Sequence, residues 1–169
     1  MPTQLGNYLN KLGVIKDHVR KLADVKKSRM NDLNNKSTAK PSPKEFYRIV
    51  YVAMKLAGLE DSEFVGAVEE IFPERPKNSL TKEFEHLPAE IRFLNKHVLK
   101  QGLVEDKIGM PENKISRLVN EKGKDLLAVE LICFMEAMNY DVLDTFKEIY
   151  GKIELKSEVK ENNKNITHN

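Results

Sequence analysis

The chain has 169 residues, of which 40% are hydrophobic and 32% charged, and its formal net charge at pH 7 is +2. This length suits one ordinary domain or two small ones. No apolar run approaches the roughly 20 residues of a membrane span, no secretory leader is recognisable, and the single Cys is typical of a reducing compartment. We therefore expect a soluble, cytoplasmic protein that does not enter a membrane.

The charges are distributed unevenly along the chain. Residues 1–44 hold ten Lys or Arg against three Asp or Glu, whereas residues 45–90 hold five basic and ten acidic residues. Residues 91–151 hold nine basic and ten acidic residues. Because a basic surface attracts polyanions such as nucleic acids, the first segment is the predicted place for one. A solvated lysine-rich surface is the alternative interpretation.

Apolar residues follow helical spacing throughout and strand-like alternation is hard to find, so the predicted fold is all-α. In the first half, Leu5, Leu9 and Leu12 begin a helix, and Pro43 opens a strongly amphipathic one. The five helices expected here lie near residues 5–12, 16–23, 26–34, 44–56 and 61–72.

The second half is predicted to begin near Ala89, after a connector with two prolines at residues 73–78. Its first helix should turn Ile91, Leu94 and Val98 inward. The segment 126–138 is the most apolar of the chain, broader than one stripe, and could face the other half or another chain. A helix over 141–150 follows, and residues 152–169 form a polar tail.

The most specific local pattern lies between residues 108 and 118. Gly109 fits a left-handed residue that ends a helix, and Pro111 suits the first turn of the next one. Ile115 and Leu118 then share one side of this next helix, with polar residues on its other sides. The pattern predicts two helices that meet at a tight corner, the second with a polar face free to bind.

This corner resembles the helix-turn-helix of the Cro-like (Xre) DNA-binding family, whose domains have the five-helix, lambda-repressor-like fold. In that family the second helix of the corner lies in the major groove. The resemblance implies that the segments 126–139 and 141–150 are the two helices that follow the reading helix.

A repeat suggests a second copy of this unit. Residues 8–11 (YLNK) and 93–96 (FLNK) are nearly the same tetrapeptide, 85 residues apart. At this offset Asp24 takes the place of Gly109, and Asp tolerates the left-handed conformation. Apolar positions coincide up to Leu33, after which we expect about three extra residues in the 36–44 loop of the first copy. The predicted organisation is a first domain at 1–72, a linker at 73–88, a second domain at 89–151 and a tail at 152–169.

The resemblance also implies which residues contact DNA. Base-facing positions correspond to Lys27, Ser28 and Asp32 in the first copy and to Glu112, Asn113 and Arg117 in the second. Asn31 and Ser116 lie on the same polar faces. Basic side chains that would hold phosphates are Lys26, Arg29, Lys36, Lys114, Lys122 and Lys124. Asp32 and Glu112 depart from the pattern, because a carboxylate repels phosphates unless it accepts a hydrogen bond from cytosine.

Enzyme chemistry is not expected. No glycine-rich phosphate loop is present, and the four His residues lack metal-ligand spacing. Cys133 fits a small core residue. We expect no metal and no cofactor. The leading hypothesis is a sequence-specific regulator of bacterial or phage type that binds double-stranded DNA. The alternatives are a protein-interaction module, with a homodimer or a different protein bound at the 126–138 helix, and a nonspecific nucleic-acid coat.

Overall fold

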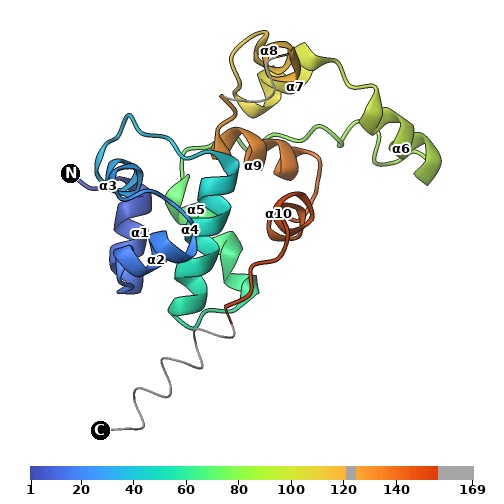
Figure 1. Cartoon of the computed structure of the whole chain (residues 1–169). Coiled ribbons are helices and arrows are strands. Elements are labelled where there is room, and N and C mark those ends of the chain that lie inside the picture. The colour runs from blue at the N-terminus through green and yellow to red at the C-terminus, as the bar shows by residue number, and fades with distance from the viewer. Residues whose placement is uncertain (121–124, 156–169) are drawn as a thin grey trace, which may run out of the picture.

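The computed structural model describes residues 1–120 and 125–155 (Figure 1). Every regular element in these ranges is helical, which confirms the predicted all-α class. The helices of the first half are α1 Gln4–Leu12, α2 Lys16–Leu22, α3 Lys27–Asn35, α4 Pro43–Leu56, a 3₁₀ turn η1 Asp61–Glu63, and α5 Phe64–Ile71. Those of the second half are α6 Ala89–His97, α7 Gln101–Ile108, α8 Lys114–Asn120, α9 Ala128–Ala137 and α10 Val142–Tyr150.

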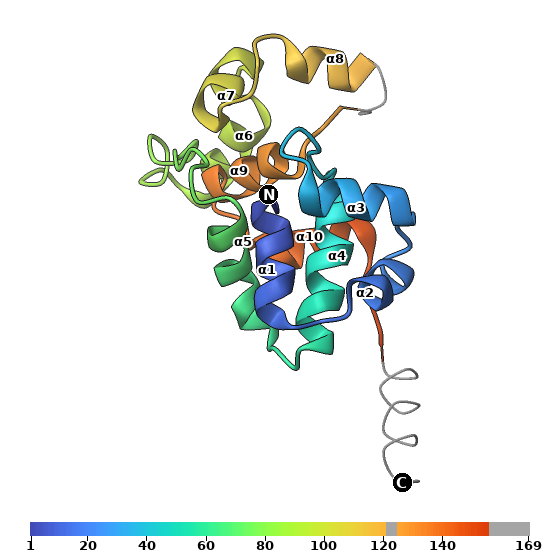
Figure 2. The same cartoon turned by 90° about the vertical axis from the view of Figure 1, so that its left-hand side faces the viewer.

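Helix α4 is the centre of the larger hydrophobic core. Ser42 and Glu45 form a capping box at its start, and Pro43 occupies its first turn. The helix is buried on nearly all sides, because α1, α2 and α5 pack on it from the first half and α9 packs on it from the second (Figure 2). Its fully buried side chains include Phe46, Tyr47, Ile49, Val50, Val52 and Met54.

The last two helices complete the core of the first half. Ile132 of α9 and Phe146 of α10 belong to the same buried cluster as Tyr47 of α4. The rings of Tyr47 and Phe146 are stacked with centroids 5.5 Å apart. Another side of α9, with Cys133 and Ala137, belongs to a smaller cluster with α7. Helix α9 therefore packs in two clusters of the same chain, which explains why the 126–138 segment is apolar on more than one side. The partner protein predicted to bind this segment stays a prediction.

The connector between the halves is fixed by Arg75. Its buried guanidinium donates to Glu136 of α9 at 2.7 and 2.8 Å and to Glu69 of α5 at 2.6 Å. It also donates to the carbonyl of Phe72. The hydrogen bonds with Glu136 raise the pKa of Arg75, so the guanidinium stays charged. The core and this ion-pair network both cross the boundary that the sequence predicts at 73–88.

Helix α1 packs closely against Leu33 and Asn34 of α3, which form its seat. The Thr3 N–H donates to the Asn34 carbonyl at 2.8 Å, and the Thr3 hydroxyl donates to the Leu33 carbonyl at 2.6 Å. A Cβ at Gly6 would lie 2.3 Å from the Asn34 carbonyl oxygen, so only glycine permits this approach. Tyr8 is consequently 4% exposed.

Helix α6 corresponds to α1 in the sequence repeat, but it does not pack on α8 as α1 packs on α3. Pro88 replaces Thr3 and can supply neither the N–H nor the hydroxyl. Ile91 replaces Gly6 and brings the Cβ that the seat excludes. Figure 1 shows α6 lying to one side of the other helices, and every residue of α6 is at least partly exposed. Phe93, which corresponds to Tyr8, is 61% exposed. The prediction that Ile91, Leu94 and Val98 point inward was therefore wrong.

Candidate nucleic-acid interface

Two helix corners occur at corresponding positions. Asp24 and Gly109 both adopt the left-handed conformation, with φ of 58° and 74°. The Val25 N–H donates to the Arg20 carbonyl at 2.9 Å, and the Met110 N–H donates to the Glu105 carbonyl at 2.9 Å. This hydrogen bond closes the end of a helix in the same way at both corners. The left-handed corners predicted from the sequence are confirmed.

At each corner an equivalent ion pair joins the second helix of the corner to the helix that follows it. Arg29 of α3 donates to Glu45 at 2.8 Å, and Lys114 of α8 donates to Glu130 at 2.6 Å. Each carboxylate also accepts the N–H that precedes its own helix.

These equivalent contacts show where the first copy has its extra residues. Arg29 and Lys114, and likewise Glu45 and Glu130, lie 85 residues apart, and so do the starts of α4 and α9. The difference therefore lies within the helices, since α4 has 14 residues and α9 has 10, and not in the 36–44 loop.

The outward side of α3 is polar and accessible. Lys26, Lys27, Ser28 and Asn31 are all exposed, while Met30 and Leu33 anchor the opposite side in the core. Asp32 is half-buried and pairs with Lys36 at 2.8 Å on the same helix side. That pairing neutralises the carboxylate that departs from the family pattern. The exposed set can approach a duplex without any part of α3 unfolding.

Arg29 differs from the other basic residues of α3. Its guanidinium makes a two-pronged contact with Glu45 and also donates to the Lys40 carbonyl at 2.9 Å. The hydrogen bonds with Glu45 raise the pKa of Arg29. The sequence suggested a phosphate contact here, but the structure places this side chain as a brace between α3, α4 and the loop that joins them.

The second corner differs in charge and in helix start. Helix α8 begins at Lys114, so Glu112 and Asn113 precede it, and Asn113 has a φ of 65°. The buried Glu105 carboxylate accepts the N–H groups of Asn113 and Ile115 at 3.1 and 2.9 Å. The Glu105 side chain thus occupies two N–H groups at the start of α8, which are then not available to a phosphate.

The remaining predicted residues of the second corner divide into three groups. Ser116 and Arg117 are exposed on α8. Lys114 is buried, and its ammonium is held by Glu130. Lys122 and Lys124 lie outside the described residues. Among the described residues, no lysine predicted to bind phosphate at this corner is therefore exposed and available to do so.

Two basic residues beside the first corner are not among the predicted DNA contacts. Lys44 and Arg48 line one depression together with Asp24 and Val25. Lys44 is exposed in the first turn of α4. The signal available in the sequence was the spacing of four between them, which places both on one side of the helix that Pro43 opens. Their position extends the basic surface from α3 onto the start of α4.

Helices α3 and α8 run in opposite directions. Figure 1 shows both nearly end-on, and Figure 2 shows both from the side with their chain directions reversed. A two-fold symmetric dimer of helix-turn-helix units presents its reading helices in this relation.

The described parts of the chain hold no group of three or more His, Cys, Asp or Glu side chains placed to bind a metal ion. None of the helices in residues 1–120 and 125–155 is long and apolar enough to span a membrane. Comparison with known proteins gave no match, whether to a family model, a curated protein or a solved structure. The resemblance to the Cro-like family therefore stays a prediction from the sequence pattern.

Proposed function

We propose that this chain is a sequence-specific DNA-binding protein with two lambda-repressor-like helix-turn-helix units of the Cro-like type, acting in transcriptional regulation. The observation that carries the proposal is the outward side of α3. It presents Lys26, Lys27, Ser28 and Asn31 next to a left-handed corner, on a helix braced by Arg29 and anchored in the core. The basic excess of residues 1–44 supports the same assignment.

Each exposed side chain of the first corner has a role in this proposal. Lys27 and Asn31 are long or bidentate groups suited to base edges, with lysine favouring guanine and asparagine favouring adenine. Lys26, Lys36 and Lys44 are placed around them as phosphate contacts, which position the protein and make affinity depend on salt. Ser28 can donate to a base or to a phosphate.

The second corner has a smaller role in the proposal. Asn113, Ser116 and Arg117 are its exposed polar groups, and the carboxylates of Glu105 and Glu112 lie near the same helix end. We expect Arg117 to contribute one contact to a neighbouring half-site, while the first corner supplies most of the affinity. The two half-sites should differ in sequence, because the two exposed sets differ.

The test begins with selection of double-stranded DNA from a random-sequence pool by the full-length protein at low salt. The wild type should enrich one motif, and Lys27→Glu should weaken binding of that motif at least tenfold, since it removes one contact and adds repulsion. The matched control is Lys82→Glu, which makes the same charge change at an exposed lysine outside the corner. No enriched motif, or equal affinity for both variants, would refute the proposal.

A protein-interaction module is the second candidate, and the uncovered helix α6 favours it. Such a module would bind heparin and DNA weakly, and a partner would copurify with the full-length chain. A nonspecific nucleic-acid coat would instead bind the pool with a steep dependence on salt but without an enriched sequence.

A further inference from the structure

Helix α6 carries an uncovered apolar stripe. Ile91 and Leu94 are three residues apart on one side of the helix, Val98 follows directly after the helix end, and all three are exposed. An exposed stripe on an isolated helix leaves apolar surface in water, and burial of that surface is favourable at about 25 cal/mol per Å². Such patches commonly mark interaction sites.

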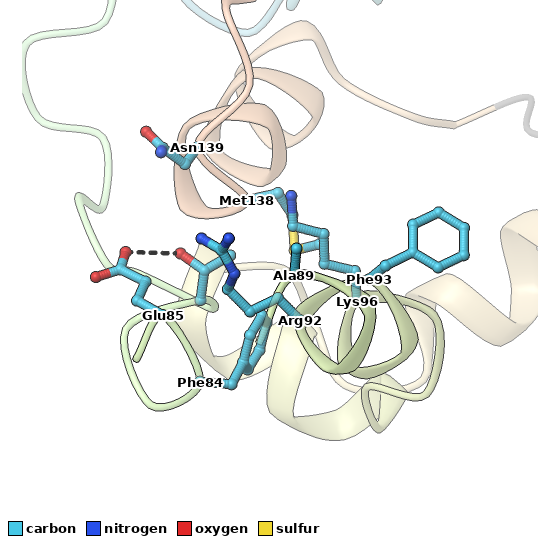
Figure 3. Close-up of a pocket in the computed structure, with 9 residues that line it drawn as sticks. Phe84, Glu85, Ala89, Arg92, Phe93, Lys96, Met138 and Asn139 are labelled. Atoms are coloured by element: carbon cyan, nitrogen blue, oxygen red, sulfur yellow. Dashed lines mark hydrogen bonds between the residues drawn. The ribbon is translucent and has the colours of Figure 1, made fainter. Parts of the chain in front are cut away.

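The opposite side of α6 faces its own chain across a pocket of mixed polar and apolar lining. Figure 3 shows Arg92 and Lys96 pointing into this pocket, toward Glu85 and the Met138–Asn139 segment that follows α9, while the Phe93 ring points away from it. The Lys96 ammonium also lies 5.2 Å from the centroid of the Tyr140 ring. Arg92 and Lys96 thus lie on the side of α6 that faces its own chain, and the apolar stripe lies on the outward side.

The stripe does not match the seat that α1 occupies in the first half. There Leu5 and Tyr8 are buried, and the corresponding α6 residues are Glu90 and Phe93. Docking α6 in that way would bury the Glu90 carboxylate, which is costly for an unpaired charge. It would also place the Ile91 side chain where Gly6 touches backbone. The second half thus has a first helix whose apolar side is suited to a different occupant.

We propose that this occupant is α6 of a second copy of the chain, bound antiparallel across a two-fold axis. In that arrangement Leu94 meets Leu94 of the second copy at the axis, and Ile91 meets Val98 on either side. An isologous contact of this kind requires a surface that is complementary to itself. The stripe meets the requirement, because apolar groups extend evenly on both sides of Leu94.

The charges beside the stripe favour the antiparallel direction. Glu90 and His97 lie seven residues apart on the same flank of α6. Antiparallel pairing brings Glu90 of each copy to His97 of the other, where the ring can donate to the carboxylate, so the contact forms twice. The opposed helix dipoles add to this preference. A parallel pair would place the Glu90 and His97 flanks of the two copies on opposite sides of the interface, where these groups could not meet.

The size of the helix sets the expected affinity. A stable interface buries about 800 Å² on each partner, and α6 has only nine residues. We therefore expect a reversible dimer with a dissociation constant on the order of 10–100 µM. This inference concerns the protein without DNA and does not depend on the proposed function.

Sedimentation equilibrium of the full-length chain is the first test. The average mass of the wild type should rise from that of the 19.4 kDa monomer toward twice this value as concentration increases. Leu94→Glu should raise the dissociation constant at least tenfold with an unchanged circular dichroism spectrum, since residue 94 is exposed in the monomer. The matched control, Arg92→Glu, lies on the pocket side and should still dimerise. A wild type that stays monomeric to several hundred micromolar overturns the proposal.

A charge exchange then tests the direction of pairing. Glu90→Lys alone and His97→Glu alone should each weaken the dimer, because the first variant removes the carboxylate that accepts from His97 and the second places two carboxylates opposite one another. Mixing the two variants should restore association as a heterodimer, since both contacts then join Lys or His to Glu. Equal self-association of the single variants, or no gain on mixing, would rule out the antiparallel α6 pair.

Discussion

The two halves of the molecule share one corner but support it differently. In the first half, α1 covers α3, and the Arg29–Glu45 pair behind the corner is partly open to solvent. In the second half, α6 leaves α8 uncovered, and the Lys114–Glu130 pair is enclosed, with side chains 9% and 6% exposed. The polar contact that joins the corner to the following helix is thus kept in both halves, whereas the covering helix is kept in only one.

This difference shows how one local motif can serve two purposes. The first corner exposes basic and amide side chains, and Asp32 of α3 is paired with Lys36. The second corner places Glu105 against the start of α8, and the helices that follow it, α9 and α10, are used to complete the core of the first half. The geometry of a corner therefore does not by itself determine what its exposed face can bind.

The largest expected difference between the halves is in how much each ion pair contributes to the free energy of unfolding. Lys114→Ala should lower the free energy of unfolding by about 3–5 kcal/mol, because it leaves the Glu130 carboxylate buried without its cation. Arg29→Ala should cost about 1 kcal/mol, because solvent reaches the Glu45 carboxylate. Urea denaturation of the two full-length variants measures both values. Equal losses would show that the two braces are energetically the same.

The second comparison uses two helical glycines, one from each half. Gly6→Ala should destabilise the protein by about 1–3 kcal/mol, since the new Cβ would meet the Asn34 carbonyl and force α1 off its seat. Gly102→Ala in α7 places its Cβ in open space. It should stabilise the protein by up to about 1 kcal/mol through helix propensity. Thermal unfolding gives the sign of each change, and a tolerated Gly6→Ala would contradict the tight seat.

The smallest effect concerns the carboxylates that join the halves. Hydrogen bonds from Lys147 and Lys55 lower the pKa of Asp61 to about 2, and those from Arg75 and Lys77 lower the pKa of Glu69 to about 2. Since these pKa values lie below the ordinary ones of 3.8 and 4.5, the contribution to stability is present above about pH 4.5 and is lost as the pH falls toward 2.

Both carboxylates are substantially exposed, so screening by solvent keeps each contribution small. Glu69→Gln should flatten the fall in melting temperature between pH 4.5 and 2. Glu74→Gln, at an exposed position of the same connector, should leave the fall as it is in the wild type. A Glu69→Gln curve that parallels the wild type would exclude a stabilising role for this contact.

Local sequence determined the helices and their corners. Apolar spacing placed the helices, Pro43 and Ser42 fixed the start of α4, and Asp24 and Gly109 marked the left-handed corners, because such features depend on residues a few positions apart. The exposure of Lys27 and Asn31 also followed from helical spacing alone.

Only the tertiary structure decided how the halves combine. The Arg29–Glu45 and Lys114–Glu130 pairs join residues 16 positions apart, and Arg75 reaches Glu136 across 61 positions. No local pattern encodes these distances. The sequence also did not predict that α6 lies away from α8, because Ile91, Leu94 and Val98 have the spacing of an ordinary buried apolar stripe. Whether such a stripe is buried depends on the fit of Pro88 and Ile91 to a surface that exists only after the rest of the chain has packed.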